Sequence, residues 1–404
     1  MLLFNEALMH YVWKHKLLLN KPLLTTAGEV FKIIQWGTHN HLDGPDFMNA
    51  KIEFGHVTLV GSIEMHLHTS DWQAHKHSSN PKYNNVILHV VYKQDATQPD
   101  LPTLLLSDYI NPMLLQRYQL LMQSEETIPC SSQLKDLLPI HQNAWLQRLM
   151  VERLEQKSQD ILAAIDHQKG HIEEVFYQTL LRYIGKNTNG ATFQALAQRI
   201  TVKLLTKHKA SKHELESLLI GGAGLLYQLE SQEHNTTFAY LQTKYELNPL
   251  QAAHWNFGKI RPSSKPIVML LLLADLINRS QKLLAKVLEA ATCKQLHVLF
   301  EVHATFKSQK YQWGADTINT LIINVIVPIV YAHGLRTNNE SQSSKALQWW
   351  EQLPTEKNNC TTAWKKMNIN PLNAADSQAL LQLHKQYCLP KNCLQCAWGL
   401  QIVS

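Results

Sequence analysis

Residues 44–77 read GPDFMNAKIEFGHVTLVGSIEMHLHTSDWQAHKH, and this stretch decides the fold. It predicts two strands, Phe47–Phe54 and Val57–His68, joined by the two-residue hairpin loop Gly55-His56. Successive side chains of a strand point to opposite faces. In the second strand one face is apolar, with Ile63, Met65 and Leu67. The other face is polar and titratable, with Ser62, Glu64, His66 and His68.

The residues on either side extend this hairpin into a mixed region of helix and strand. Asn5 can cap a helix that carries Glu6. Glu29–Trp36 predicts a strand before the hairpin, and the nearly continuous apolar run Asn85–Tyr92 predicts a strand buried on both faces after it. Within that run, His89 is expected to be a core histidine satisfied by a hydrogen bond. The expected order is a helix, three strands, a short helical or irregular link and a further strand.

After residue 110 the apolar pattern becomes helical almost throughout. The predicted helices are Pro112–Gln123, Pro139–His167, Glu173–Tyr183, Thr192–Leu205, Lys212–Leu229, Leu270–Ala290, Thr317–His333 and Ser377–Tyr387. We therefore expect an α+β protein with two parts. Residues 1–108 form an α/β domain with the candidate site, and residues 109–404 form a mainly helical domain that ends in a cysteine cluster.

The composition is that of a folded globular protein, with 45% hydrophobic and 17% charged residues among 404. The longest apolar runs fall short of the roughly 20 residues that cross a bilayer. Glu6 and His10 interrupt the N-terminus where a signal peptide would be apolar, so we expect a cytoplasmic protein without a membrane partner. Residues 1–100 hold 8 Lys and Arg against 9 Asp and Glu, so the net charge of +6 arises later in the chain. Such an excess permits DNA or RNA as a partner without requiring it.

Two carboxylates of the hairpin are candidate metal ligands. Asp46 begins one strand, and Glu64 lies along its partner. A twisted hairpin can bring these positions together, where two carboxylates would bind Mg²⁺ through oxygen. Such an ion can activate water and stabilise charge on a phosphodiester. His66 would orient water, share a proton or join the metal shell.

This arrangement resembles the PD-(D/E)xK nuclease superfamily over about residues 1–95. The core of that superfamily is a helix, three strands, a helix and a strand, with an acidic residue on the first helix, Asp at the start of the second strand and Glu-x-Lys on the third. The matching residues here are Glu6, Pro45-Asp46 and Glu64-Met65-His66. The resemblance implies a restriction-endonuclease-like αβββαβ core and a nuclease for DNA or RNA that depends on Mg²⁺ or Mn²⁺. Its catalytic residues would be Glu6, Asp46, Glu64 and His66.

Histidine at the usual lysine position opens an alternative, because imidazole is not an always-charged ammonium. The protein would then be an inactive descendant of the nuclease fold that binds nucleic acid or protein. A third interpretation is a zinc hydrolase whose ligands are His66, His68, His75 and His77, with Asp71 between them. The run His-Leu-His-Thr-Ser-Asp is similar to the His-x-His-x-Asp-His motif of metallo-β-lactamase-type hydrolases. It is one residue longer, and Trp72 replaces the final histidine.

Over its whole length the chain is similar to a family of uncharacterised bacterial proteins. The shared motifs are Gly44-Pro45-Asp46-Phe47, GSIEMH at 61–66, Asp71-Trp72 with His75 and His77, ILHVV at 87–91, and three C-terminal cysteines. That family has no established activity to transfer, so function has to be argued from the site.

The three C-terminal cysteines have the spacing C-x4-C-x2-C. Cys388, Cys393 and Cys396 can place three thiolates around one metal, and His384 or a distant cysteine would supply the fourth ligand. We expect zinc or an iron–sulfur cluster in a structural role, and some nucleases of the resembled superfamily carry a cysteine-bound iron–sulfur cluster that staples the chain. The other cysteines are expected to be small buried residues. They are Cys130, Cys293 and Cys360.

Overall fold

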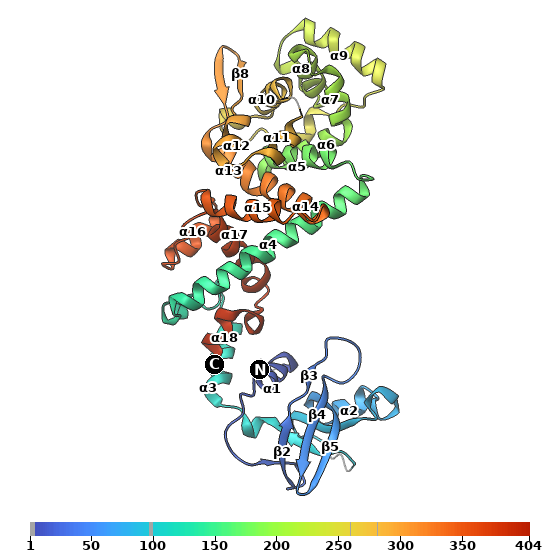
Figure 1. The fold of residues 1–404 in the computed structure, drawn as a ribbon, viewed down its shortest axis with the longest axis vertical. Coiled ribbons are helices and arrows are strands. Elements are labelled where there is room, and N and C mark those ends of the chain that lie inside the picture. The colour runs from blue at the N-terminus through green and yellow to red at the C-terminus, as the bar shows by residue number, and fades with distance from the viewer. Residues whose placement is uncertain (1–4, 97–99, 259, 281) are drawn as a thin grey trace. The chain divides into compact units, whose positions relative to one another are not determined.

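The computed structural model describes residues 5–96, 100–258, 260–280 and 282–404. It confirms a mixed fold with an N-terminal sheet and a large helical region (Figure 1). Contacts group the chain into two compact units. Unit 1 is Met1–Trp145 together with Leu383–Ser404, and unit 2 is Leu146–Gln382. The domain boundary expected at residue 108 stays a prediction.

A mixed β-sheet forms the centre of unit 1. Its strands follow the order β1-β2-β4-β5-β6-β7, and β3 pairs with β4. They are β1 (Leu23–Leu24), β2 (Val30–Gln35), β3 (Thr38–His39), β4 (Phe47–Phe54), β5 (Val57–His68), β6 (Val86–Lys93) and β7 (Thr103–Leu105). The pairings among β1 to β5 are antiparallel, whereas β6 runs parallel to β5 and β7 runs parallel to β6. The predicted hairpin is β4–β5, and the strands predicted before and after it are β2 and β6.

The loop and bulge at the start of β4 fix the position of Asp46. Gly44 has φ 121°, a region that favours glycine. The side-chain amide of Asn40 donates to the Pro45 carbonyl (3.1 Å), and the Asn40 N–H donates to the Asp46 carbonyl (2.7 Å). The register with β5 shifts after Phe47, which forms a bulge of the kind that redirects nearby side chains. Asp46 is thereby held beside β5.

Helix α1 (Glu6–Lys14) packs on β5. It begins as predicted at Asn5, whose side-chain oxygen accepts a hydrogen bond from the Leu8 N–H (3.0 Å). The link between β5 and β6 contains α2 (Asp71–Ala74), η1 (His77–Ser79) and η2 (Pro81–Tyr83). The further helical segments of unit 1 are η3 (Leu106–Tyr109), α3 (Pro112–Gln123), η4 (Ser131–Asp136), η9 (Leu383–Cys388), η10 (Cys393–Gln395) and α18 (Ala397–Val403). Helix α4 (Pro139–His167) begins in unit 1 and continues into unit 2.

Gly61 lets β5 approach the start of β6 closely. A Cβ at this position would overlap the Asn85 carbonyl oxygen and lie 2.5 Å from Ile87 Cγ2. Gly61→Ala should therefore lower the free energy of unfolding of unit 1 by about 1–3 kcal/mol, the usual cost of overpacking. Urea denaturation measures this loss. Gly314→Ala is the control, because a Cβ there meets nothing within 4 Å, and equal stability of the two variants would contradict the prediction.

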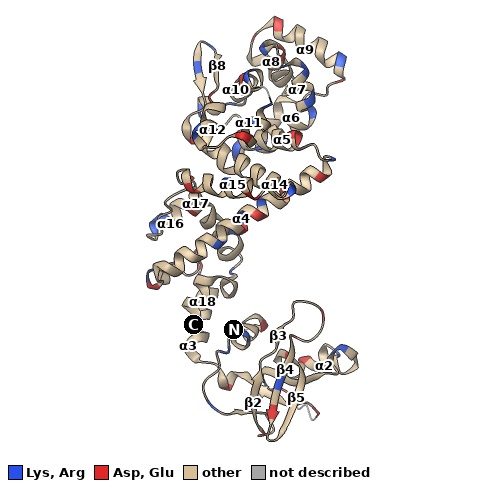
Figure 2. Cartoon of the chain, in the orientation of Figure 1, with Lys and Arg blue, Asp and Glu red and all other residues tan. Residues whose placement is uncertain are grey.

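Unit 2 is helical around one large apolar core. Beyond α4, its elements are α5 (Ile172–Ile184), α6 (Lys186–Arg199), α7 (Val202–His208), α8 (Lys212–Gly222), η5 (Leu226–Gln228), α9 (Gln232–Tyr245), η6 (Ala252–His254), η7 (Pro262–Ser264), α10 (Pro266–Arg279), α11 (Leu283–Glu289), α12 (Cys293–Leu299), β8 (His303–Phe306), β9 (Gln309–Gln312), α13 (Ala315–Leu321), η8 (Ile322–Ile326), α14 (Val327–Arg336), α15 (Glu340–Gln352), α16 (Asn359–Lys366) and α17 (Ala374–Gln382). Lys and Arg are interspersed with Asp and Glu along these helices, so the basic excess is spread over several elements (Figure 2).

Three predicted helices of unit 2 are wrong as single elements. The helix predicted at 212–229 ends at Gly222, and η5 begins at Leu226. The helix predicted at 192–205 is broken between α6 and α7, where the Thr201 side chain caps α7 by accepting from the Leu204 N–H. The helix predicted at 270–290 ends at Arg279, and α11 begins at Leu283. The hairpin β8–β9 was not predicted at all. These breaks depend on caps and tertiary packing that an apolar pattern does not encode.

One segment of the described chain is long and apolar enough to span a membrane by length and composition. It is Ala315–Arg336, which comprises α13, the π-helical η8 and α14. Most of it is buried inside unit 2, and this burial accounts for its apolar composition.

Candidate metal centre

Strand β5 places two side chains of the candidate site on one face. Glu64 and His66 lie two residues apart and are 6% and 1% exposed. Strand β6 lies beside β5 in the same sheet, and Glu64 is paired with His89 in the parallel register. A carboxyl group buried among imidazoles is costly unless partners satisfy it. Glu64 therefore needs polar partners in the interior of unit 1.

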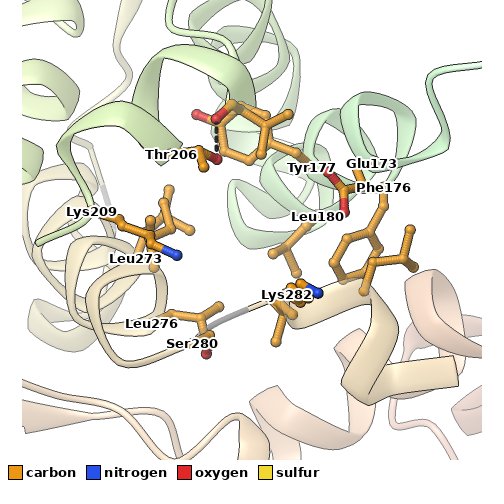
Figure 3. A pocket seen from close by; sticks show the side chains of 14 residues that line it. Glu173, Phe176, Tyr177, Leu180, Thr206, Lys209, Leu273, Leu276, Ser280 and Lys282 are labelled. Carbon is orange, nitrogen blue, oxygen red and sulfur yellow. Dashed lines mark hydrogen bonds between the residues drawn. The ribbon is translucent and has the colours of Figure 1, made fainter. Parts of the chain in front are cut away.

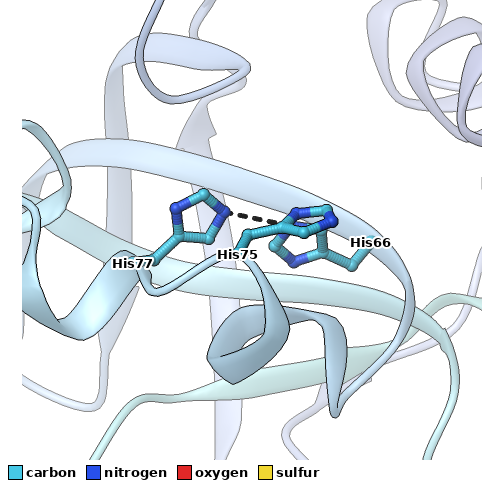
Figure 4. A group of neighbouring side chains, drawn as sticks. All are labelled: His66, His75 and His77. Carbon is cyan, nitrogen blue, oxygen red and sulfur yellow. Dashed lines mark hydrogen bonds between the residues drawn. The ribbon is translucent and has the colours of Figure 1, made fainter.

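The link after β5 brings two more histidines to Glu64 and His66. The His75 N–H donates to the Asp71 carbonyl (2.9 Å) at the end of α2. Lys76 then has φ 58°, and this left-handed turn starts η1 with the ring of His77 buried. The rings of His66, His75 and His77 converge from the strand and this link (Figure 4).

Four of the distances among the facing atoms of these side chains are nearly equal. His66 Nε2 is 3.2 Å from both His75 Nδ1 and His77 Nε2. Glu64 Oε1 is 3.5 Å from His66 Nε2 and 3.4 Å from His77 Nε2. Zinc binds nitrogen and oxygen at about 2.0–2.2 Å, so the corners of a tetrahedron around it are about 3.3–3.6 Å apart. The three imidazole nitrogens lie within 4.8 Å of one another and are close enough to bind one ion, and Glu64 Oε1 lies beside two of them.

Burial gives this group unusual pKa values. Burial, and after it the charge of Asp46, raises the pKa of Glu64 to about 8. Burial, and after it the neighbouring His89 and His77, lowers the pKa of His66 to about 3. Burial also lowers the pKa of His77. His66 and His77 are therefore neutral at pH 7, which is the form of imidazole that binds metals.

A hydrogen bond to His89 on β6 orients His66. His66 Nδ1 is 2.9 Å from His89 Nε2, and His89 is completely buried. With the proton on His66 Nδ1, its Nε2 presents a lone pair to the centre of the group. Metal-binding histidines commonly use their second ring nitrogen in this way. The prediction that His89 is a core histidine held by a hydrogen bond is confirmed.

Asp46 borders the group and is partly exposed. Its N–H donates to Glu64 Oε2 (3.2 Å), and its Oδ2 accepts from the Met65 N–H (2.8 Å). Its Oδ1 is 3.3 Å from His10 Nε2 on α1. Burial and then the charge of Asp46 raise the pKa of Glu6 on the same helix. The carboxylates predicted at three separate elements are thus brought within electrostatic reach of one another.

The remaining predicted ligands lie outside this group. The side chain of His68 is 45% exposed, and its Nδ1 is 3.6 Å from Asp71 Oδ2. The same carboxylate oxygen accepts the His68 N–H (2.9 Å), so this pair fastens the link. Sequence reasoning missed Tyr83, whose ring stacks on His77 with 3.8 Å between centroids. The predicted cysteine ligands lie in the C-terminal segment of unit 1: Cys388, Cys393 and Cys396.

A family model described as "Protein of unknown function (DUF2851)" matches residues 6–359. The chain belongs to the DUF2851 family. The expected membership of an uncharacterised family is thereby confirmed. The matched range includes all four groups of the candidate metal centre and ends before the C-terminal cysteines. No curated protein and no solved structure matches this DUF2851 chain.

The DUF2851 chain also has a cavity of about 280 Å³ in unit 2 (Figure 3). Apolar side chains such as Phe176, Leu180 and Leu273 line it, together with Lys209 and Lys282. Every residue predicted for the catalytic site lies in unit 1. The cavity is therefore a separate feature from the candidate metal centre.

Proposed function

We propose that unit 1 is a cytoplasmic, metal-dependent nuclease that hydrolyses phosphodiester bonds in DNA or RNA. The observation that carries the proposal is the group of three imidazole nitrogens from His66, His75 and His77, which lie within 4.8 Å of one another. Glu64 Oε1 lies beside two of them, at 3.5 and 3.4 Å. A divalent cation bound there would lower the pKa of a water molecule and stabilise charge on a phosphoryl oxygen.

The order of elements supports a nuclease over other hydrolases. Helix α1 precedes β2, β4 and β5, which pair antiparallel, and α2 then leads to β6, which is parallel to β5. Apart from the two-residue strands β1 and β3, this order agrees with the αβββαβ order that the resemblance to PD-(D/E)xK nucleases implies, and the agreement supports the proposal. Glu6 lies on the helix, Asp46 precedes the second core strand, and Glu64 and His66 lie on the third.

The donor set favours Zn²⁺ over the Mg²⁺ or Mn²⁺ expected from sequence. Mg²⁺ and Mn²⁺ prefer carboxylate and water oxygens, whereas imidazole nitrogen suits zinc. With three imidazoles among the four donors, His66 acts as a ligand and not as a replacement for the usual lysine. The nuclease and the histidine-bound zinc that the sequence suggested as alternatives are thereby combined in one centre.

Asp46 is the group we propose as the proton acceptor. Its side chain is 22% exposed, whereas that of Glu64 is 7% exposed, so water reaches Asp46 more easily. The Met65 N–H holds one carboxylate oxygen, and the other faces His10. A carboxylate fixed beside the ion can take a proton from the attacking water.

Cleavage of defined oligonucleotides tests the proposal. Protein treated with EDTA and reloaded with Zn²⁺ should cleave single-stranded DNA, duplex DNA or RNA, and Mg²⁺ alone should support less cleavage. Asp46→Asn should keep the bound ion and lose about 100-fold or more of the rate, because general base catalysis contributes about 10²–10⁴-fold. Metal analysis of the variant separates loss of catalysis from loss of the ion.

The matched control is Asp43→Asn, which removes an exposed carboxylate of the same loop that pairs with Lys82. Equal losses in the two variants would assign the effect to the charge of the loop. If the zinc-loaded protein binds nucleic acid without cleaving it, the result would support the alternative of an inactive nucleic-acid-binding protein and contradict the nuclease. A wild-type protein that does not bind zinc would contradict the proposed metal centre.

A further inference from the structure

The cavity of about 280 Å³ in unit 2 is large for the interior of a helical domain. Protein interiors are close-packed and have few voids larger than a water molecule. An empty cavity lowers stability in proportion to its volume. Small-molecule sites begin at about 300 Å³ and are mostly apolar with a few polar groups. The cavity has both properties and is therefore a candidate ligand-binding site.

Helices α5, α7 and α10 each present one face to this cavity. Residues four positions apart lie on the same side of a helix. The lining contains one such pair from each helix: Phe176 and Leu180, Val202 and Thr206, and Leu273 and Ile277. The start of α11 completes the wall. The cavity is therefore bounded by regular elements of unit 2.

Hydrogen bonds hold these helices around the cavity. The Val202 N–H donates to Glu174 Oε2 (3.1 Å) and joins the start of α7 to α5. The side-chain amide of Asn278 donates to the Lys209 carbonyl (2.7 Å) and joins α10 to the end of α7. Both ends of α7 are thus tied to a neighbouring wall. These ties keep the three helices apart at the cavity, where closer packing would otherwise fill it.

The lining is basic on one side and apolar on the other. Lys209 and Ser280 lie on one side of the cavity, and Phe176 and Leu180 lie on the other (Figure 3). Lys209 is half-buried, and its ammonium group has no hydrogen-bond or ion-pair partner among the described residues. A positive charge beside an apolar surface is complementary to a ligand with an anionic head and an apolar body.

The other charged side chains of the lining leave an excess of positive charge. They are Lys282, which is exposed, and Glu173 on α5. The lining thus has two ammonium groups and one carboxylate. Glu173 lies beside Phe176, away from Lys209 (Figure 3). An anionic head at Lys209 therefore avoids the only carboxylate among the described lining residues.

The volume of the cavity limits the size of the ligand. An apolar cavity of about 150 Å³ binds benzene. The cavity of unit 2, at about 280 Å³, has room for a molecule about twice as large. Decanoate, a carboxylate with a linear ten-carbon chain, has this size.

We propose that the cavity of unit 2 binds a carboxylate with a linear alkyl chain of medium length, similar to decanoate. The carboxylate pairs with the Lys209 ammonium group, and the chain extends toward Phe176 and Leu180. Each buried CH₂ strengthens binding about fourfold, so the chain supplies most of the affinity and Lys209 sets its direction. This site does not depend on the proposed nuclease, whose residues all lie in unit 1.

Calorimetric titration of the full-length protein tests the role of Lys209. Octanoate and octanol have chains of equal length, and only octanoate is charged. Lys209→Met should weaken octanoate binding about tenfold, the usual value of a hydrogen bond to a charged group, and leave octanol binding unchanged. Lys207→Met is the matched control, because Lys207 also belongs to α7 but faces the ring of Tyr245. This control should bind both ligands like the wild-type protein.

The length of the chain and the volume of the cavity are tested separately. Decanoate should bind the wild-type protein about tenfold more tightly than octanoate, because it buries two more CH₂ groups. Leu180→Trp, which fills the cavity, should abolish binding of both carboxylates. Decanoate should raise the thermal unfolding midpoint of the wild-type protein and not that of this variant.

Three results would overturn the proposal. The first is a wild-type protein that shows no saturable binding of decanoate. The second is a Lys209→Met variant that binds octanoate like wild type, or that loses octanoate and octanol equally. The third is a folded Leu180→Trp variant, checked by circular dichroism, that still binds decanoate with wild-type affinity. Loss of nucleic-acid cleavage in unit 1 would leave this site in place.

Discussion

Replacing His77 with alanine should weaken Zn²⁺ binding by the histidine centre more than about 100-fold. His77 Nε2 lies 3.2 Å from His66 Nε2 and 3.4 Å from Glu64 Oε1, and His77 is one of the three histidines whose ligand atoms lie within 4.8 Å of one another. Loss of an outer partner of a metal ligand already costs about 10–100-fold in affinity, and loss of a ligand should cost more. Competition with a chromophoric chelator, in protein whose C-terminal thiolates are unchanged, measures the affinity of this centre.

The fold should survive this substitution. Outside the histidine centre the ring of His77 stacks on Tyr83, and its Nδ1 has no hydrogen-bond partner within the described chain. His68→Ala is the matched control, because His68 contacts Asp71 and lies outside the four-atom set. This control should bind Zn²⁺ like the wild-type protein. Equal affinities in both variants would exclude His77 as a ligand.

Features that depend on neighbouring residues could be predicted from the sequence. The Asn5 cap, the two-residue loop of the hairpin and the alternation that puts Glu64 and His66 on one face all follow from local rules. The register set by the two-residue loop alone would pair Phe47 with Glu64, and the bulge near the start of β4 shifts it so that Asp46 lies beside Glu64. Local rules therefore predict the face that Glu64 and His66 share, whereas the approach of Asp46 depends on a bulge that the sequence did not reveal.

The convergence of the histidines does not follow from such rules. His75 and His77 meet at His66 because Lys76 between them adopts a left-handed conformation, which is uncommon for lysine and has no local signal. The support from His89 depends on the parallel pairing of β5 with β6. Such contacts are set by tertiary packing. For this reason the sequence predicted a carboxylate site and a histidine site as alternatives, whereas in the structure Glu64 lies next to the histidines.

Contacts between distant segments were also beyond local patterns. The C-terminal segment returns to unit 1 after the whole of unit 2, and no periodicity reports which elements it will meet. Sequence patterns therefore could not predict that η10, in this returning segment, packs on α1.

Glu64→Gln should make the metal-free protein more stable at alkaline pH, although it removes a proposed ligand. Burial and the charge of Asp46 raise the pKa of Glu64 from 4.5 to about 8 in the folded protein. In the unfolded chain the carboxyl group titrates near its ordinary pKa. Between these pKa values the folded protein binds more protons, so its stability falls as pH rises and is fully reduced above about pH 8. Glutamine does not ionise, and the variant avoids this loss.

The expected difference is large because each pH unit between the two pKa values corresponds to about 1.4 kcal/mol. The interval from 4.5 to about 8 gives on the order of 5 kcal/mol at pH 9 and little at pH 4. Urea unfolding in EDTA at both pH values measures it, and Glu29→Gln, an exposed carboxylate before β2, should show no such gain. Added Zn²⁺ should make the wild-type protein more stable than Glu64→Gln at pH 9, because an ion stabilises only a folded state that binds it. A Glu64→Gln protein that is less stable than wild type at pH 9 in EDTA would contradict this prediction. The ionised Glu64 carboxylate would then stabilise the folded protein through its hydrogen bonds, and its burial would not be explained by metal binding.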